Sequence, residues 1–270
     1  MTIGKRLWRW TVWPIRNRAL HRARRIRHAL GGRLGAGMRR SLSVIVLSYA
    51  RPANIDKILS TLVLCEFVGE IIVSNNNPAV SLERYVSVTD PRIRIVHQPV
   101  PTPASVRFDL SRHAQHDDII AIDDDIFPSP RQVRILYERL LANPAVPHGF
   151  GGETWGRPPS LATRRLVSRV PGSAPVDALV WIFAYTKAHV RRYFELLRAL
   201  NIENGDLRSS EDVVLSFSGE GDALVHGVGR LHFCPSDDDD AIATFKRPGF
   251  VEHRLDLVER CLRLRAARDA

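Results

Sequence analysis

Three consecutive carboxylates in the middle of the chain follow a short apolar segment. Asp123, Asp124 and Asp125 come directly after the apolar residues 119–122. Adjacent carboxylates repel one another, so burying them without a cation is costly. A hard divalent ion such as Mg²⁺ or Mn²⁺ removes that repulsion and can bridge a diphosphate. The alternative is a solvated acidic turn that caps the next helix. The apolar run favours a metal site at Asp125 and Asp123.

A second acidic pair, Glu211–Asp212, opens a predicted helix after a polar segment. Acidic residues are favoured in the first turn by the helix dipole, so capping alone would explain the pair. The functional interpretation is that one carboxylate orients an acceptor hydroxyl or removes its proton. Composition does not choose between these two. The longer acidic run 237–240 follows no buried strand, and we predict a solvated loop there.

The elements that must position these residues alternate along the chain from residue 43 onward. Short apolar runs predict strands at 43–48, 70–74, 93–96, 119–122 and 178–184. Apolar residues at helical spacing predict helices at 55–62, 133–140, 190–200, 213–217 and 255–262. This rhythm predicts an α/β fold with an open, mostly parallel sheet flanked by helices. Ligands of such sheets bind at the carboxyl ends of the strands, where the three aspartates lie.

The basic charge of the protein is concentrated at its amino end. The formal net charge is +10, but residues 1–40 carry 12 of the 39 Lys and Arg residues and no Asp or Glu. The other 27 basic residues therefore face 29 acidic ones. We predict a Trp/Arg-rich basic extension and linker at 1–41 and one folded domain at 42–270. The extension suits an anionic membrane surface; a solvated arm or a protein contact is the alternative, and nucleic acid is not expected.

Cysteine usage and hydropathy bear on location. Cys65, Cys234 and Cys261 form no CxxC pair, which argues against zinc or a disulfide framework and suits a reducing compartment. No run of about 18 apolar residues is present, and arginines interrupt any signal peptide. We expect a cytoplasmic location, with the extension at the inner face of the membrane.

The order of the motifs resembles glycosyltransferase family 64, the family of the exostosin C-terminal domains. The similar segments span residues 43–261. They are SVIVLSYARP at 43–52, EIIVSNNNP at 70–78, SVRFDL at 105–110, IIAIDDDI at 119–126, HGFGG at 148–152, SSEDVVLSF at 209–217 and FVEHRLDLVERC at 250–261.

The resemblance implies a GT-A fold, a UDP-sugar donor, Mn²⁺ (or Mg²⁺), and hexosyl or N-acetylhexosaminyl transfer with retention of anomeric configuration. The acceptor would be a glycan or a lipid-linked hydroxyl. By position, the implied donor-binding residues are Arg51, Asn76, Arg107, Asp123, Asp124, His253 and Arg254, the last two closing over the diphosphate. Asp125, with Asp123, would hold the metal, and Asp212, with Glu211, would lie at the reacting centre.

Other functions fit parts of the sequence. An inverting glycosyltransferase of the family-2 kind shares the pattern of a strand followed by carboxylates, with Asp212 as general base. A sugar nucleotidyltransferase would normally show a Gly-rich basic loop after the first strand, and SYARPAN is a poor version of it. Trp155 and Trp181 are either core residues or surfaces that stack on acceptor sugars. His226 is either a satisfied core histidine or a metal ligand.

Overall fold

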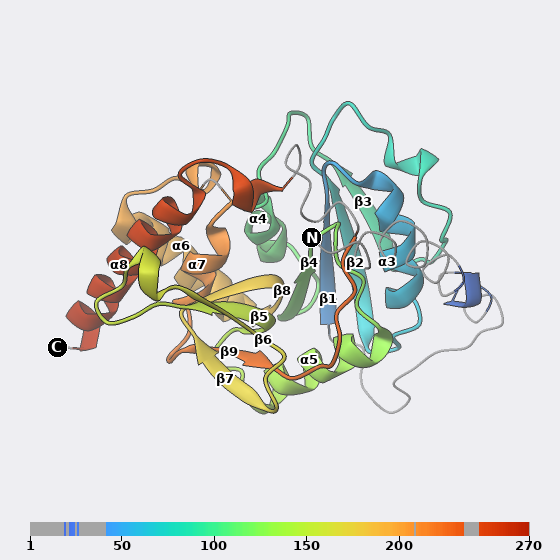
Figure 1. Ribbon diagram of the computed structural model, residues 1–270. Helices are drawn as coiled ribbons and strands as arrows, with labels where there is room; N and C mark the ends of the chain where they lie inside the picture. The colour runs from blue at the N-terminus through green and yellow to red at the C-terminus, as the bar shows by residue number, and fades with distance from the viewer. Residues whose placement is uncertain are drawn as a thin grey trace, which may run out of the picture.

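A computed structural model describes residues 42–207, 209–234 and 243–269, together with Ala19, residues 22–24 and Ile26 (Figure 1). The linker 31–41, the acidic run 237–240 and most of the basic extension lie outside the described residues. The interpretations given for those three segments therefore stay predictions.

Within the described residues, the chain forms a nine-stranded mixed sheet in the order β3-β2-β1-β4-β8-β5-β9-β7, with β6 paired to β5. Its parallel half comprises β1 (Leu42–Ser48), β2 (Val68–Asn75), β3 (Ile93–His97) and β4 (Asp118–Ile122). Its mixed half comprises β5 (His148–Thr154), β6 (Arg165–Ser168), β7 (Ser173–Val176), β8 (Ala178–Thr186) and β9 (Ala223–His226). Strand β8 runs antiparallel to β4 and joins the two halves.

Helices cover both faces of the sheet. The helices α3 (Ile55–Leu62) and α5 (Pro130–Ala142) pack on one face, with Val44 and Val46 of β1. The opposite face, with Ile45 and Leu47, carries α4 (Val106–Arg112), α6 (Lys187–Leu200), α7 (Glu211–Ser216) and α8 (Phe250–Asp269). Figure 1 shows α3 on one side and α6, α7 and α8 on the other. Every residue of β1 is buried, and its interior, residues 44–47, is a continuous apolar run.

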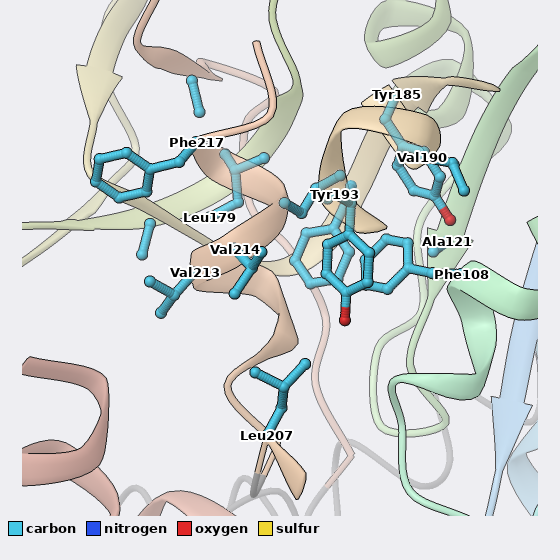
Figure 2. Close-up of a cluster of buried hydrophobic side chains, with 14 of the residues drawn as sticks. Phe108, Ala121, Leu179, Tyr185, Val190, Tyr193, Leu207, Val213, Val214 and Phe217 are labelled. Atoms are coloured by element: carbon cyan, nitrogen blue, oxygen red, sulfur yellow. The ribbon is translucent and has the colours of Figure 1, made fainter. Parts of the chain in front are cut away.

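A hydrophobic cluster packs under α6 and α7 (Figure 2). The rings of Phe108 and Tyr193 lie 4.1 Å apart between centroids, and the hydroxyls of Ser111 and Tyr185 are 2.9 Å apart. Val213 and Val214 bury one side of the short helix α7 in this cluster. The first turn of α7, with Glu211 and Asp212, is thereby held against the sheet.

The predicted open, mostly parallel sheet flanked by helices is confirmed. The short 3-10 helices η2 (Pro52–Asn54), η3 (Leu82–Arg84), η4 (Leu161–Thr163), η5 (Asn204–Asp206) and η6 (Thr244–Lys246) connect its elements. In the part of the chain that the structure describes, no helix is both long enough and apolar enough to cross a membrane.

Candidate active site

The middle aspartate of the triplet holds the loop that follows β1. Asp124 Oδ2 accepts hydrogen bonds from the backbone N–H groups of Tyr49 (3.0 Å) and Arg51 (3.3 Å). Asp124 Oδ1 accepts from Arg51 Nη1 at 3.0 Å, and its carbonyl accepts from the Asn54 amide at 2.8 Å. Its carboxylate thus shapes this loop, and the donor contact implied for Asp124 by the resemblance stays a prediction.

The side chains of the two flanking aspartates, Asp123 and Asp125, are partly exposed to solvent. The side chains of Asp123 and Asp125 are 34% and 25% exposed, and Arg51 Nη1 lies 3.2 Å from Asp125 Oδ2. Within the described ranges, no three His, Cys, Asp or Glu side chains are grouped to hold a metal ion. Two carboxylates nevertheless fit Mg²⁺ or Mn²⁺, because these ions commonly complete their shell with substrate phosphates and water.

The asparagine run after β2 connects the ends of β1 and β2. Asn76 is buried; its N–H donates to the Ser48 carbonyl at 2.8 Å and its Oδ1 accepts from Ser74 Oγ at 2.6 Å. Asn77 Nδ2 donates to the Tyr49 carbonyl at 3.3 Å. The aromatic side chain presented at this edge is Tyr49, which is 49% exposed and was not anticipated from the sequence.

A buried arginine joins the aspartate triplet to the second acidic pair. Arg107 Nη2 lies 2.7 Å from Asp123 Oδ1 and 3.2 Å from Glu211 Oε1, and its side chain is 2% exposed. Burial raises the pKa of Glu211 to about 7, because desolvation outweighs the opposing charge of Arg107. A carboxyl group with this pKa changes its charge near neutral pH.

A second buried arginine holds the neighbouring carboxylate. Arg254 Nη1 lies 2.6 Å from Asp212 Oδ1, and Arg254 Nε lies 3.0 Å from Glu153 Oε2. Glu153 is also paired with Arg164, and the two arginines hold the pKa of Glu153 below its usual value despite burial. Burial raises the pKa of Asp212, against the effect of Arg254. Arg254 is 1% exposed and pairs with two carboxylates through Nη1 and Nε; the diphosphate contact implied for it by the resemblance stays a prediction.

The amino end of α7 has unused hydrogen-bonding capacity. Four buried polar atoms there lack a partner among the described residues: Arg107 Nη1, Ser210 Oγ, Glu211 Oε2 and Arg254 Nη2. Buried polar groups in proteins are nearly always satisfied, so a cluster of exceptions is typical of a site that receives a polar ligand or water.

The remaining predicted residues lie at different distances from this network. His253 Nε2 contacts the Leu207 carbonyl at 3.2 Å. His226 Nε2 lies 2.8 Å from His148 Nδ1, and its Nδ1 lies 2.7 Å from Ser173 Oγ, so it is a satisfied buried histidine. Glu153 and Arg164 belong to the network but were not predicted. Their signal in the sequence is weak: Glu153 is a lone acid in a glycine-rich segment.

The structure therefore brings both acidic motifs into one site. Arg51, Asp124 and Asp125 form one group at the end of β1 and β4, and Arg107 links Asp123 to the first turn of α7. A model of glycosyl transferase family 2 matches residues 43–193, more than half of the chain. The chain belongs to glycosyl transferase family 2.

Membership of this family makes the protein a glycosyltransferase with a nucleotide-sugar donor and an acceptor. The match supports the alternative of an inverting family-2 enzyme better than it supports a retaining family-64 enzyme. The resemblance to family 64 is not borne out by this match. No curated protein matches this family member in sequence.

Solved structures share the fold at low identity. A crystal structure of GalNAc-T7 with UDP, GalNAc and Mn²⁺ is similar over 71% of this chain and 43% of that chain, at 10% identity and a TM-score of 0.52. S. aureus TarS is similar over 73% of this chain and 61% of that chain, at 13% identity and a TM-score of 0.47. A CMP:2-keto-3-deoxy-manno-octonic acid synthetase complexed with CTP is similar over 71% of this chain and 91% of that chain, at 14% identity and a TM-score of 0.45.

The family-2 chain thus spans less than half the length of the GalNAc-T7 chain. At this identity, the likeness to GalNAc-T7 shows the GT-A fold alone.

Proposed function

We propose that this family-2 enzyme transfers a hexosyl or N-acetylhexosaminyl group from a UDP-sugar to a hydroxyl of a glycan or lipid-linked acceptor, with inversion at the anomeric carbon. The observation that carries the proposal is the position of Asp212. Its Oδ1 is fixed by the buried guanidinium of Arg254, and its side chain keeps 11% exposure. A carboxylate fixed on one oxygen and accessible on its outer side suits a general base.

The donor half of the site is the end of β1 and β2. Asp124 fixes the loop at 49–54, and the exposed ring of Tyr49 offers a surface on which a nucleotide base can stack. Asn77 holds the backbone of Tyr49 in place. Arg51 brings a positive charge to the same edge, where the diphosphate of the donor would lie.

Asp123 and Asp125 are the residues that would hold Mn²⁺ or Mg²⁺. The bound ion would supply positive charge to the diphosphate that leaves. Arg107 orients Asp123 through the contact of 2.7 Å between Arg107 Nη2 and Asp123 Oδ1. Arg107 Nη1 has no partner among the described residues and can donate to a substrate oxygen.

In the proposed transfer, Asp212 accepts the proton of the acceptor hydroxyl. The acceptor oxygen forms a bond to the anomeric carbon from the face opposite the diphosphate. The bond from that carbon to the diphosphate oxygen breaks, and UDP leaves with the electron pair. Burial raises the pKa of Asp212, which makes it a better base. Arg254 and Glu153 act as positioning residues because they reach the acceptor only through Asp212.

The test is UDP release from a panel of UDP-sugars with Mn²⁺ or with EDTA, for wild type and Asp212→Asn. We expect one donor to be turned over and Asp212→Asn to lose about 10²–10⁴-fold in transfer while still binding the donor. NMR of the product then gives its anomeric configuration. Retention would overturn the inverting mechanism. A wild type that binds no nucleotide-sugar by calorimetry would overturn the proposed donor and reaction.

A further inference from the structure

Trp181 has a backbone conformation that aromatic residues rarely adopt. Its φ angle is 77°, and the residue lies within β8 rather than in a turn. A bulky side chain at positive φ is sterically unfavourable and persists only where its surroundings enforce it. Because such strain collects at binding and catalytic sites, the contacts of Trp181 bear on function.

Neighbouring strand β5 makes room for the indole. The pairing of β5 with β8 shifts in register between Gly149 and Gly151. A Cβ added at Gly151 would lie 2.2 Å from Cζ3 of Trp181, so only glycine leaves space for the ring. The irregularity turns Trp181 and Ile182, which follow one another, toward the same core cluster. The indole meets Phe233 edge-on, with ring centroids 5.0 Å apart.

Strand register and the Phe233 contact connect Trp181 to the segment that carries the aspartate triplet. Ile122 of β4 pairs with Ile182 of β8, and the two strands are antiparallel. Beyond this pair, the next residue of β8 is Trp181 and the next residue after β4 is Asp123. Phe233 forms a bridge with Ile126, and the Cys234 N–H donates to the Asp125 carbonyl at 2.6 Å. Trp181 is only partly buried. Its ring therefore packs on Phe233, whose neighbour Cys234 hydrogen-bonds to the backbone of Asp125, one of the two aspartates that we assign to the metal.

We propose that the indole of Trp181 stacks on the pyranose ring of a bound sugar next to Asp123 and Asp125. The inference rests on the proposed function and adds a sugar subsite to it. One face of a pyranose is lined with C–H groups, which suits the face of an aromatic ring in a pocket otherwise lined by charges. The donor sugar and the acceptor sugar share this chemistry, and the experiment distinguishes them.

Glycine is the informative substitution at this position. Trp181→Gly removes the ring and also relieves the backbone strain, because glycine adopts positive φ readily. If the ring serves only to pack the core, the variant changes stability and leaves sugar affinity alone. Arg169→Gly is the matched control: its φ is 57°, it is exposed, and it lies between β6 and β7.

The experiment measures the Kd of UDP and of the UDP-sugar by calorimetry, the KM for the acceptor, and the thermal midpoint of each variant. We expect Trp181→Gly to bind UDP as wild type does. If the ring holds the donor sugar, the Kd of the UDP-sugar rises about tenfold or more; if it holds the acceptor, the KM for the acceptor rises by that factor and donor affinity is kept. Arg169→Gly should change none of these values.

A folded Trp181→Gly with unchanged Kd and KM would overturn the sugar subsite. If circular dichroism shows that Trp181→Gly does not fold, Trp181→Asn replaces it, because asparagine also tolerates positive φ. If wild type and Trp181→Gly turn over a UDP-sugar equally well, the sugar subsite is refuted and the proposed function is kept. Wild type that binds no nucleotide-sugar refutes the subsite and the proposed function together.

Discussion

Arg254 of α8 lies between two buried carboxylates, 2.6 Å from Asp212 Oδ1 and 3.0 Å from Glu153 Oε2. The C-terminal helix thereby contributes the counter-charge of the proposed base. Two carboxylates buried near one another would repel if this guanidinium were absent. The arrangement links the end of the chain to the chemistry of α7.

Arg254→Met should therefore destabilise the protein and alter its pH profile. Leaving buried charges uncompensated costs about 3–5 kcal/mol in unfolding free energy. The pKa of Asp212 should rise further, so the acidic limb of kcat should move to higher pH. Urea unfolding at pH 7.5 and a pH–rate profile measure the two effects.

Arg263→Met on the same helix is the control for this prediction. Arg263 is 67% exposed and lies 3.8 Å from Glu259, so its loss should change the unfolding free energy by no more than about 0.5 kcal/mol. If Arg254→Met kept the stability and pH profile of wild type, the positioning role of Arg254 would be refuted.

Asp124 and Asp125 should behave differently although they are adjacent. Asp124→Asn weakens the hydrogen bonds to Tyr49 and Arg51, so we expect a loss of about 2 kcal/mol in unfolding free energy together with weaker UDP binding. Asp125→Asn, at a partly exposed position, should keep the unfolding free energy within about 0.5 kcal/mol.

The activity of Asp125→Asn should nevertheless fall by about 10²-fold or more, because Asp125 is one of the two carboxylates that we propose to hold the metal. Chemical denaturation and Mn²⁺ titration of UDP release separate the two variants. Equal losses of unfolding free energy for both substitutions would contradict a structural role for Asp124 and a metal-binding role for Asp125.

Most of the parallel half of the fold could be predicted because β1, β2 and β4 are buried on both faces. Residues 119–122 form a plain apolar run, and β4 occupies 118–122 in the structure. Strand β5 could not be predicted from the sequence because it contains glycines at 149, 151 and 152, and glycine normally weakens a strand. In the structure they make room: a Cβ at Gly152 would lie 2.7 Å from Val176, and one at Gly151 would strike Trp181.

The acidic motifs of the site could also be predicted, but their partners could not. The location of Asp123 and Asp125 follows from the strand that precedes them. The pairing of Arg254 with Glu153 joins residues 101 positions apart and depends on how α8 crosses the sheet. Likewise, no local pattern indicates that Asp124 turns inward while its two neighbours do not.

Acid should destabilise the protein through its buried histidines. Burial, with the neighbouring His148, lowers the pKa of His226 from 6.5 to about 4. Between these two pH values the unfolded chain binds a proton that the folded chain does not, so stability falls as the pH drops from 6.5 to 4. His226→Gln should flatten this dependence in urea unfolding, whereas the exposed His113→Gln should not. An unchanged slope in His226→Gln would refute the prediction.

Glu211 should have the opposite effect on stability in an overlapping pH range. Its pKa is raised by burial from 4.5 to about 7, so the folded chain holds a proton that the unfolded chain loses between these values. This contribution therefore weakens stability as the pH rises from 4.5 to 7. In Glu211→Gln the contribution disappears, and unfolding free energy should rise more steeply with pH than in wild type across this range. The measurement is urea unfolding in half-unit pH steps. His226→Gln alone should show the lowest slope with pH, and the double variant Glu211→Gln/His226→Gln should show a slope between those of the two single variants. A Glu211→Gln curve parallel to wild type would mean that Arg107 keeps Glu211 ionised throughout.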